Sequence, residues 1–331
     1  MEIVSGGSNW NLVIRREQGG ITILRAGTPD QRASLPERLF DIPVTALGNR
    51  ALAPERQGDH VPAGAEAVQI ICGIPEEGAA WDNRCLQDLT LPVGLTGLGD
   101  YALLNCSALK TLRIYDGIAR WGGGALMNCR GLDVLHLTRT GEDQGEALAW
   151  FVGELSRELD VTIYGPGGEP AARLVFPEYT ELYEENCPAH HFDYFISGAG
   201  YPYHHCFRQK RLSLKEYDAL WRDFLGMEHD ETAAIRLAWY RLRWPADMGE
   251  TAEADYRAYL KDHAWEALRL LLEEEDGAGL PLLLELAEPG REALSAACAL
   301  ARELGATASL AALLEEQHRR FPCGLEKSFA L

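Results

Sequence analysis

The side chains best suited to chemistry gather in one stretch, ENCPAHHFDYFISGAGYPYHHCF, which runs from Glu185 to Phe207. Its zinc-ligand residue types are Cys187, His190, His191, His204, His205 and Cys206. A Cys-x-x-His pair and a His-Cys pair separated by a loop could close a tetrahedral zinc site. A cysteine beside a histidine is also the pair from which an activated nucleophile is built. A metal-dependent or nucleophilic enzyme on cluster 187–206 is therefore the alternative hypothesis for this chain.

The spacing within this stretch favours a simpler interpretation. Neighbouring histidines in one chain point in different directions, and the spacing matches no zinc family known to us. The many Phe and Tyr residues are typical of a segment that packs between domains. The sequence also lacks G-x-S-x-G, H-E-x-x-H and P-loop motifs, and SGAGY lacks the flanking strand and helix of a phosphate loop. We therefore expect an ordered linker, no bound metal, no cofactor and no enzymatic activity.

Composition bounds the classes of partner and the compartment. The chain has 331 residues, enough for two domains, and a formal net charge of −19, which repels nucleic acid and anionic lipid. It starts without the basic and apolar segments of a secretory signal, and no apolar run reaches the roughly 18 residues of a membrane span. The eight cysteines are scattered without a C-x-x-C pair. We expect a cytoplasmic protein with reduced cysteines that binds neither nucleic acid nor membrane.

The most informative pattern is an internal repeat. ALLNCSALKTLRI begins at Ala102 and ALMNCRGLDVLHL begins at Ala125, 23 residues later. Leu86, Leu109 and Leu132 each open an L-x-x-L-x-L-like segment at the same period. Such a period is the signature of a leucine-rich solenoid, in which the alternating leucines point inward and coils stack because none can bury its apolar face alone.

The repeated Asn-Cys pair is predicted to be structural. Asn105 and Asn128 suit a buried turn, where an amide can satisfy backbone groups that no ladder reaches. Cys106 and Cys129 suit the tight interior of that turn, because a free cysteine behaves as a small apolar side chain. A catalytic nucleophile rarely recurs at a structural period.

These lines resemble BspA-type leucine-rich repeats, the 23-residue bacterial class. SLPERLFDIPVTALGNRALA, from Ser34 to Ala53, resembles the opening coil of such proteins. Leu47-Gly48 precedes Leu98-Gly99 by 51 residues, which is two periods of 23 residues plus 5. We therefore expect a degraded coil between them over 53–84, with AVQIICGI as its strand. NWNLVIRREQGGITIL predicts a β-hairpin that caps the open end of the solenoid.

The second half of the chain predicts helices. EALAWFVGELSRELDVTIYG gives a helix and a strand that close the stack, and a capping box at Ser213-x-x-Glu216 opens the helical region. Two helix pairs are expected over 263–287 and 290–321, and their spacing resembles ankyrin-type pairs without the T-P-L-H signature. The predicted fold is α/β. A short leucine-rich solenoid with caps occupies 1–175, a packed linker 176–210, and an all-α helical-hairpin domain 211–331.

A repeat fold favours binding over catalysis, because solenoids present extended concave surfaces of parallel strands. We expect a non-catalytic interaction or scaffold protein that binds a protein partner through the concave repeat face, the helical array, or both. The predicted partner-binding residues are Thr90, Lys110, Arg113, Asp133 and His136. A purely structural or self-associating protein is a third hypothesis.

Overall fold

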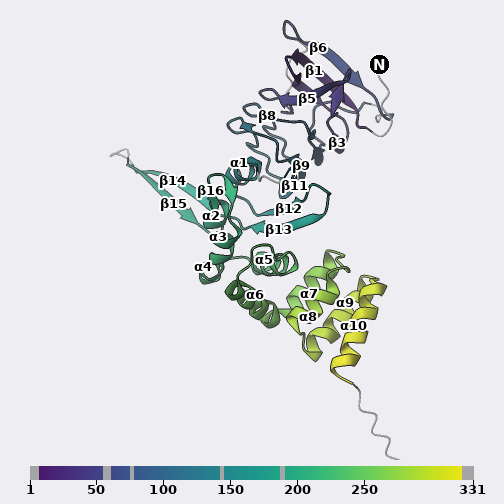
Figure 1. Ribbon diagram of the computed structural model, residues 1–331, viewed down its shortest axis with the longest axis vertical. Coiled ribbons are helices and arrows are strands. Elements are labelled where there is room, and N and C mark those ends of the chain that lie inside the picture. The colour runs from purple at the N-terminus through teal and green to yellow at the C-terminus, as the bar shows by residue number, and fades with distance from the viewer. Residues whose placement is uncertain (1–6, 55–60, 75–77, 142–144, 187–190, 323–331) are drawn as a thin grey trace, which may run out of the picture. The chain divides into compact units, whose positions relative to one another are not determined.

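The computed structural model describes residues 7–54, 61–74, 78–141, 145–186 and 191–322, and its contacts divide the chain into two units, Met1–Leu220 and Trp221–Leu331. Residues 176–210 thus group with the first unit. The expected division into 1–175, 176–210 and 211–331 stays a prediction about which parts fold alone. Figure 1 shows the elements of both units.

The first unit begins with the predicted hairpin cap. Strands β1 (Trp10–Glu17) and β2 (Gly20–Gly27) pair antiparallel, as the alternating apolar residues require. They belong to a seven-stranded sheet ordered β10-β8-β5-β2-β1-β6, with β4 beside β5. Its other strands are β4 (Arg38–Leu39), β5 (Ile42–Leu47), β6 (Glu66–Ile70), β8 (Gly97–Leu98) and β10 (Arg120–Trp121).

A six-stranded sheet ordered β13-β12-β11-β9-β7-β3 forms the second side of the solenoid. The strands are β3 (Arg32–Ser34), β7 (Asp88–Thr90), β9 (Thr111–Tyr115), β11 (Val134–Thr138), β12 (Leu159–Tyr164) and β13 (Pro170–Phe176). All neighbours are parallel except β12 and β13. Leu89, Leu112 and Leu135 lie directly opposite one another and are fully buried, which confirms the predicted leucine column.

The degraded coil expected over 53–84 is wrong. Strand β3 pairs directly with β7, and Leu47 lies opposite Leu98, so the coils that contain them are immediate neighbours. The 51-residue separation is one 23-residue period plus an insertion of 28 residues. The predicted strand AVQIICGI supplies β6, which pairs antiparallel with β1 and extends the hairpin sheet instead of joining the stacked coils.

The turn asparagines differ from the prediction in burial. Asn105 and Asn128 have φ angles of 63° and 61°, so they occupy the left-handed region, which asparagine tolerates better than most residues. Asn128 is exposed and its amide donates to Asn105 Oδ1 at 2.9 Å. A buried asparagine that bonds backbone groups lies instead on the inserted segment: Asn83 donates to two carbonyls and accepts one N–H.

The turn cysteines behave as predicted. Cys106 and Cys129 are each 1% exposed, and their thiols donate to the Leu52 and Leu103 carbonyls at 3.4 and 3.1 Å. Burial raises the pKa of Cys129 to about 12 and that of Cys106 well above its usual value, so both stay protonated.

A group of short helices and strands, here called the helical cap, packs against β13, the last strand of the repeat sheet. The cap includes α1 (Ala147–Gly153), α2 (Tyr201–His204), α3 (Leu214–Ala219) and the short strands β16 (Phe207–Arg208) and β17 (Arg211–Leu212). From α3, the buried Tyr217 hydroxyl donates to the Val175 carbonyl at 2.6 Å and accepts its N–H at 3.1 Å. In the chain between β13 and α2, β14 (Thr180–Asn186) and β15 (His191–Ser197) form a separate hairpin.

The second unit is helical, as predicted. It comprises α4 (Trp221–Gly226), α5 (Glu231–Arg243), α6 (Glu250–Asp262), α7 (Ala264–Glu273), α8 (Leu280–Ala287), α9 (Arg291–Glu303) and α10 (Thr307–Arg320). Helix α7 packs on α5 and α9, and α8 packs on α6 and α10, so three successive helix pairs stack in two layers. The α5–α6 pair precedes the two helix pairs predicted over 263–287 and 290–321.

Candidate functional site

The outward side chains of the six-stranded sheet, here called the repeat face, are arranged in rows by the strand register. Thr90, Arg113 and His136 lie directly opposite one another on β7, β9 and β11. The row continues with Thr162 on β12 and Arg173 on β13. Because neighbouring strands lie about 4.8 Å apart, one extended ligand can contact several members of the row.

The other two predicted residues lie just outside the strands. Lys110 and Asp133 immediately precede β9 and β11, and the Asp133 N–H donates to the Lys110 carbonyl at 3.2 Å. Both side chains are exposed. The structure therefore gathers three predicted residues in one row and sets the other two at its margin on adjacent coils.

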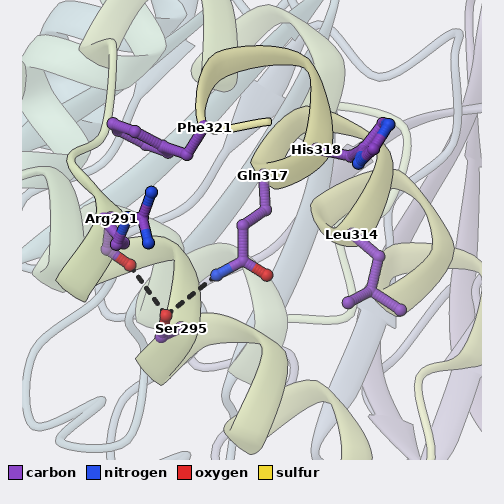
Figure 2. A pocket seen from close by; sticks show the side chains of 6 residues that line it. All are labelled: Arg291, Ser295, Leu314, Gln317, His318 and Phe321. Atoms are coloured by element: carbon purple, nitrogen blue, oxygen red, sulfur yellow. Dashed lines mark hydrogen bonds between the residues drawn. The ribbon is translucent and has the colours of Figure 1, made fainter. Parts of the chain in front are cut away.

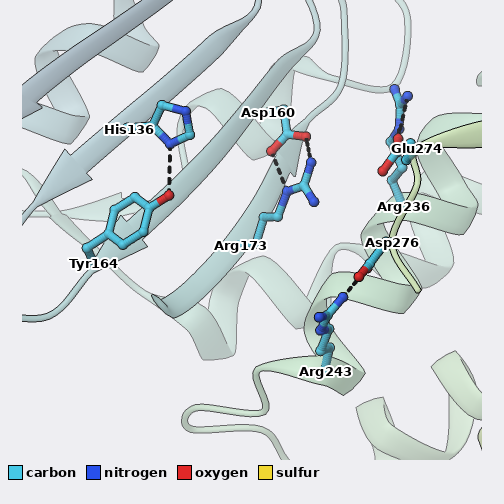
Figure 3. Close-up of polar contacts among 8 residues, drawn as sticks. All are labelled: His136, Asp160, Tyr164, Arg173, Arg236, Arg243, Glu274 and Asp276. Carbon is cyan, nitrogen blue, oxygen red and sulfur yellow. Dashed lines mark hydrogen bonds and ion pairs between the residues drawn. The ribbon is translucent and has the colours of Figure 1, made fainter. Parts of the chain in front are cut away.

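The carboxylates of the repeat face are already engaged (Figure 3). Asp160 accepts two hydrogen bonds from the Arg173 guanidinium, one of them at 2.9 Å from Nε, and both groups are mostly buried. Asp88 lies 3.3 Å from Arg32 Nε. Arg113 is exposed and forms no ion pair with any residue that the structure describes. The positive charge of Arg113 thus lies between two ion pairs, Arg32–Asp88 and Arg173–Asp160, and has no acidic partner among the described residues.

His136 is held in its neutral form beside this charge. Its Nδ1 lies 3.2 Å from the Tyr164 hydroxyl, and the two rings lie 5.7 Å apart between centroids (Figure 3). Burial lowers the pKa of His136, and the Arg113 charge lowers it further, against an opposing effect of Asp160. The imidazole therefore offers a hydrogen-bonding surface next to Arg113 without adding a second charge near neutral pH.

Sequence reasoning missed the part of the repeat face on β12 and β13. Asp160, Thr162, Tyr164 and Arg173 belong to it, because the register carries the rows onward. The 23-residue period stops after β11, where α1 intervenes, and β13 runs antiparallel. The alternation in DVTIY was visible, but its register against β11 was not.

The Cys/His stretch is spread over different environments. Cys187, His190 and the side chain of His191 lie outside the described parts of the structure. His204 is buried, with Nδ1 and Nε2 each 3.0 Å from a carbonyl oxygen, and burial lowers its pKa. Cys206 is buried and donates to the Tyr203 carbonyl at 2.9 Å. Among the described residues, no three His, Cys, Asp or Glu side chains are grouped to hold a metal ion.

The helical unit contains one shallow pocket between α9 and α10, of about 390 Å³ (Figure 2). It is lined by Arg291, Ser295, Leu314, Gln317, His318 and Phe321. Its polar groups are linked, because Gln317 donates to Ser295 Oγ at 2.9 Å and Ser295 donates to the Arg291 carbonyl at 2.8 Å. The Arg291 guanidinium lies over the Phe321 ring at 5.2 Å.

Two ion pairs join other helices of the same unit (Figure 3). Arg236 Nε lies 3.0 Å from Glu274 Oε1, and Arg243 pairs with Asp276. These partly buried pairs tie α5 to the end of α7 and the turn after it, so they are structural. No helix in the described parts of the chain has the length and apolar character needed to cross a bilayer.

No protein-family model and no curated protein matches the chain. Among solved structures, it is similar to a leucine-rich cell surface protein from Faecalibacterium prausnitzii A2-165, at 17% identity and a TM-score of 0.27. That match covers 51% of this chain and 44% of the other. A leucine-rich repeat protein of T. pallidum matches at 15% identity and a TM-score of 0.19, over 41% of this chain and 72% of the other. The repeat assignment rests on this chain's own period and strand register.

Proposed function

We propose that the protein is a non-catalytic interaction or scaffold protein whose repeat face binds a protein partner. The observation that supports this most directly is the row formed by Thr90, Arg113 and His136, in which an exposed guanidinium stands beside neutral hydrogen-bonding groups. Arginine is enriched among the residues that contribute most to protein interfaces. A stack of coils also presents such a row over a long distance, as an extended ligand requires.

The charges of the repeat face indicate an acidic segment as the ligand. Asp88 and Asp160 are satisfied by arginines of the same face, whereas Arg113 has no acidic partner among the described residues. A carboxylate of the partner would complete this set and could bind the guanidinium through two parallel hydrogen bonds. At the margin, the exposed Lys110 and Asp133 carry opposite charges, so the preference for an acidic chain comes from Arg113.

Quantitative capture with matched variants tests the proposal. The full chain, Arg113→Ala and Arg130→Ala are each used to capture proteins from a native extract, and the bound proteins are quantified by mass spectrometry. Arg130 is also exposed and lies in a turn, off the repeat face. We expect Arg113→Ala to weaken a partner by at least about fivefold, or 1 kcal/mol, at an unchanged melting temperature. Equal losses from both variants would contradict the proposal.

The family subclass and the compartment are also proposals. The 23-residue period and the Asn-Cys turns support membership of the BspA-type bacterial repeats. The scattered cysteines, which form no C-x-x-C pair, support a cytoplasmic protein, and fractionation of the native cell tests this. About one zinc per chain by elemental analysis, lost in Cys206→Ser, would instead favour the metal-dependent enzyme.

The helical unit is a second candidate surface, because its α9–α10 pocket is open and Leu314 at its rim is 42% exposed. Leu314→Asp in the same capture experiment tests it. Partners lost with Leu314→Asp but kept with Arg113→Ala would assign recognition to the helical array.

A further inference from the structure

The hairpin of β14 and β15 belongs to neither of the two large sheets of the first unit. Within the described residues, these two strands pair only with each other, and Figure 1 shows them pointing away from the stacked coils. An isolated two-stranded hairpin is at best marginally stable in water, and its outer edges present unpaired N–H and C=O groups. Packing within the first unit therefore does not explain why the β14–β15 hairpin forms an extended arm.

The arm exposes large apolar side chains on both faces. Leu182 and Phe195 lie directly opposite each other and are each 50% exposed. Tyr194 and Ile196, at 46% and 38% exposure, flank Phe195 along β15 and therefore lie on the other face of the ribbon. Single exposed apolar residues are common on monomers, but a cluster on one small element is typical of an interaction surface.

The charge of the arm and its surroundings has a single sign. Residues 174–207 contain no Lys or Arg and five acidic residues, Glu178, Glu181, Glu184, Glu185 and Asp193. Strand alternation places Asp193 on the face of Leu182 and Phe195, and Glu181 on the face of Ile196. Each apolar face is thus flanked by a carboxylate. Two copies of the arm placed against each other would bring like charges together, which disfavours self-pairing.

We propose that this arm is a docking site for an extended segment of a partner protein in which pairs of apolar residues alternate with pairs of Lys or Arg, so that each face of the added strand carries both kinds of side chain. The segment adds to the open edge of β15 through backbone hydrogen bonds, as in β-strand addition. On one face its apolar side chains cover Phe195 and Leu182, and its basic side chains meet Asp193. On the other face, Ile196 and Glu181 offer the same combination. This site is separate from the repeat face and takes a ligand of opposite charge.

Two labelled peptides test the proposal against the full chain by fluorescence anisotropy. In one, pairs of Val alternate with pairs of Lys, and in the other, pairs of Val alternate with pairs of Glu. We expect the Lys peptide to bind at least about tenfold more tightly than the Glu peptide, with an affinity that falls as salt is added. Phe195→Thr should weaken the Lys peptide about tenfold. Met127→Thr, at an equally exposed apolar residue of a turn, should leave it unchanged, and so should Arg113→Ala.

Hydrogen exchange on the unmodified protein provides a measurement that does not depend on variant folding. The Lys peptide should slow exchange of the β15 amides while leaving those of β11 unchanged. Equal binding of the two peptides, no binding, or no protection of β15 would each overturn the proposal. A dimer seen by light scattering that Phe195→Thr dissociates would also overturn it, because a second copy would then cover the arm.

Discussion

Replacing Asn83 should damage the repeat unit far more than replacing an asparagine of the visible repeat. Asn83 is 2% exposed, and its amide nitrogen donates to the Ala26 and Leu52 carbonyls, both at 2.8 Å. Its side-chain oxygen accepts the Thr28 N–H at 2.8 Å. Through these three bonds the inserted segment is joined to the hairpin cap and to the first coil.

The magnitude follows from a comparison with Asn128. Their φ angles are 62° and 61°, so the backbone cost of placing alanine in the left-handed region is common to both variants. Asn83→Ala removes three buried hydrogen bonds worth about 1 kcal/mol each, and the Leu52 carbonyl keeps only the weak thiol donor of Cys106. Asn128→Ala removes one exposed bond between side chains. We expect Asn83→Ala to be more destabilising by about 3 kcal/mol or more.

Thiol labelling in the native state measures this difference inside the unit concerned. Cys106 is buried, and its thiol shares the Leu52 carbonyl with Asn83, so it reacts only when this region opens. A difference of 3 kcal/mol corresponds to labelling of Cys106 that is about a hundredfold faster in Asn83→Ala than in Asn128→Ala. Peptide mapping separates this thiol from the half-buried cysteines. Equal acceleration by the two variants would refute the assignment of Asn83 as the link.

Three further predictions concern the same unit. Leu112→Ala should lower the free energy of unfolding by about 2 to 5 kcal/mol, whereas Thr111→Ala should change it by less than about 0.5 kcal/mol; equal urea midpoints would mean that the strand register is wrong. Tyr217→Phe should cost about 1 to 3 kcal/mol, because both backbone groups of Val175 lose their partner, and the exchange of that amide should accelerate. Burial lowers the pKa of His136 below 6.5, so the unfolded chain binds a proton more readily than the folded one. Stability should therefore fall as the pH decreases below about 6.5, and His136→Gln should reduce that loss in urea midpoints measured at about pH 7.5 and about pH 5.5.

The features predicted correctly from the sequence are those that repeat. The leucine columns and the buried turn cysteines were identified because a period of 23 residues superimposes equivalent environments. The insertion over 53–84 was misjudged because its length is close to one further period, and AVQIICGI has the alternation of a strand in either sheet. The pairings of β3 with β7 and of β5 with β8 show that the stack skips this segment.

The candidate site was predicted in the same partial way. Thr90, Arg113 and His136 were found because they occupy one position of successive coils. The ion pair between Asp160 and Arg173 was not, since it depends on the antiparallel return of β13 after the last repeat. The hairpin arm lies in the segment expected to be a packed linker, where exposed aromatic residues and core residues have the same composition.

The repeat sheet and the β14–β15 hairpin differ in what occupies the backbone groups of their outer strands. This difference explains why we expect a ligand to bind the face of the repeat sheet but the edge of the hairpin. At one end of the repeat sheet, the buried Trp10 indole donates to the Ser34 carbonyl at 2.8 Å, and Ser8 Oγ accepts the Ser34 N–H at 2.8 Å. At the other end, Tyr217 bonds both backbone groups of Val175. Side chains thus occupy backbone groups of both outer strands, which discourages strand addition and leaves the outward rows for ligands. The β14–β15 hairpin pairs with no further strand among the described residues, so a strand added at its edge displaces no strand neighbour there.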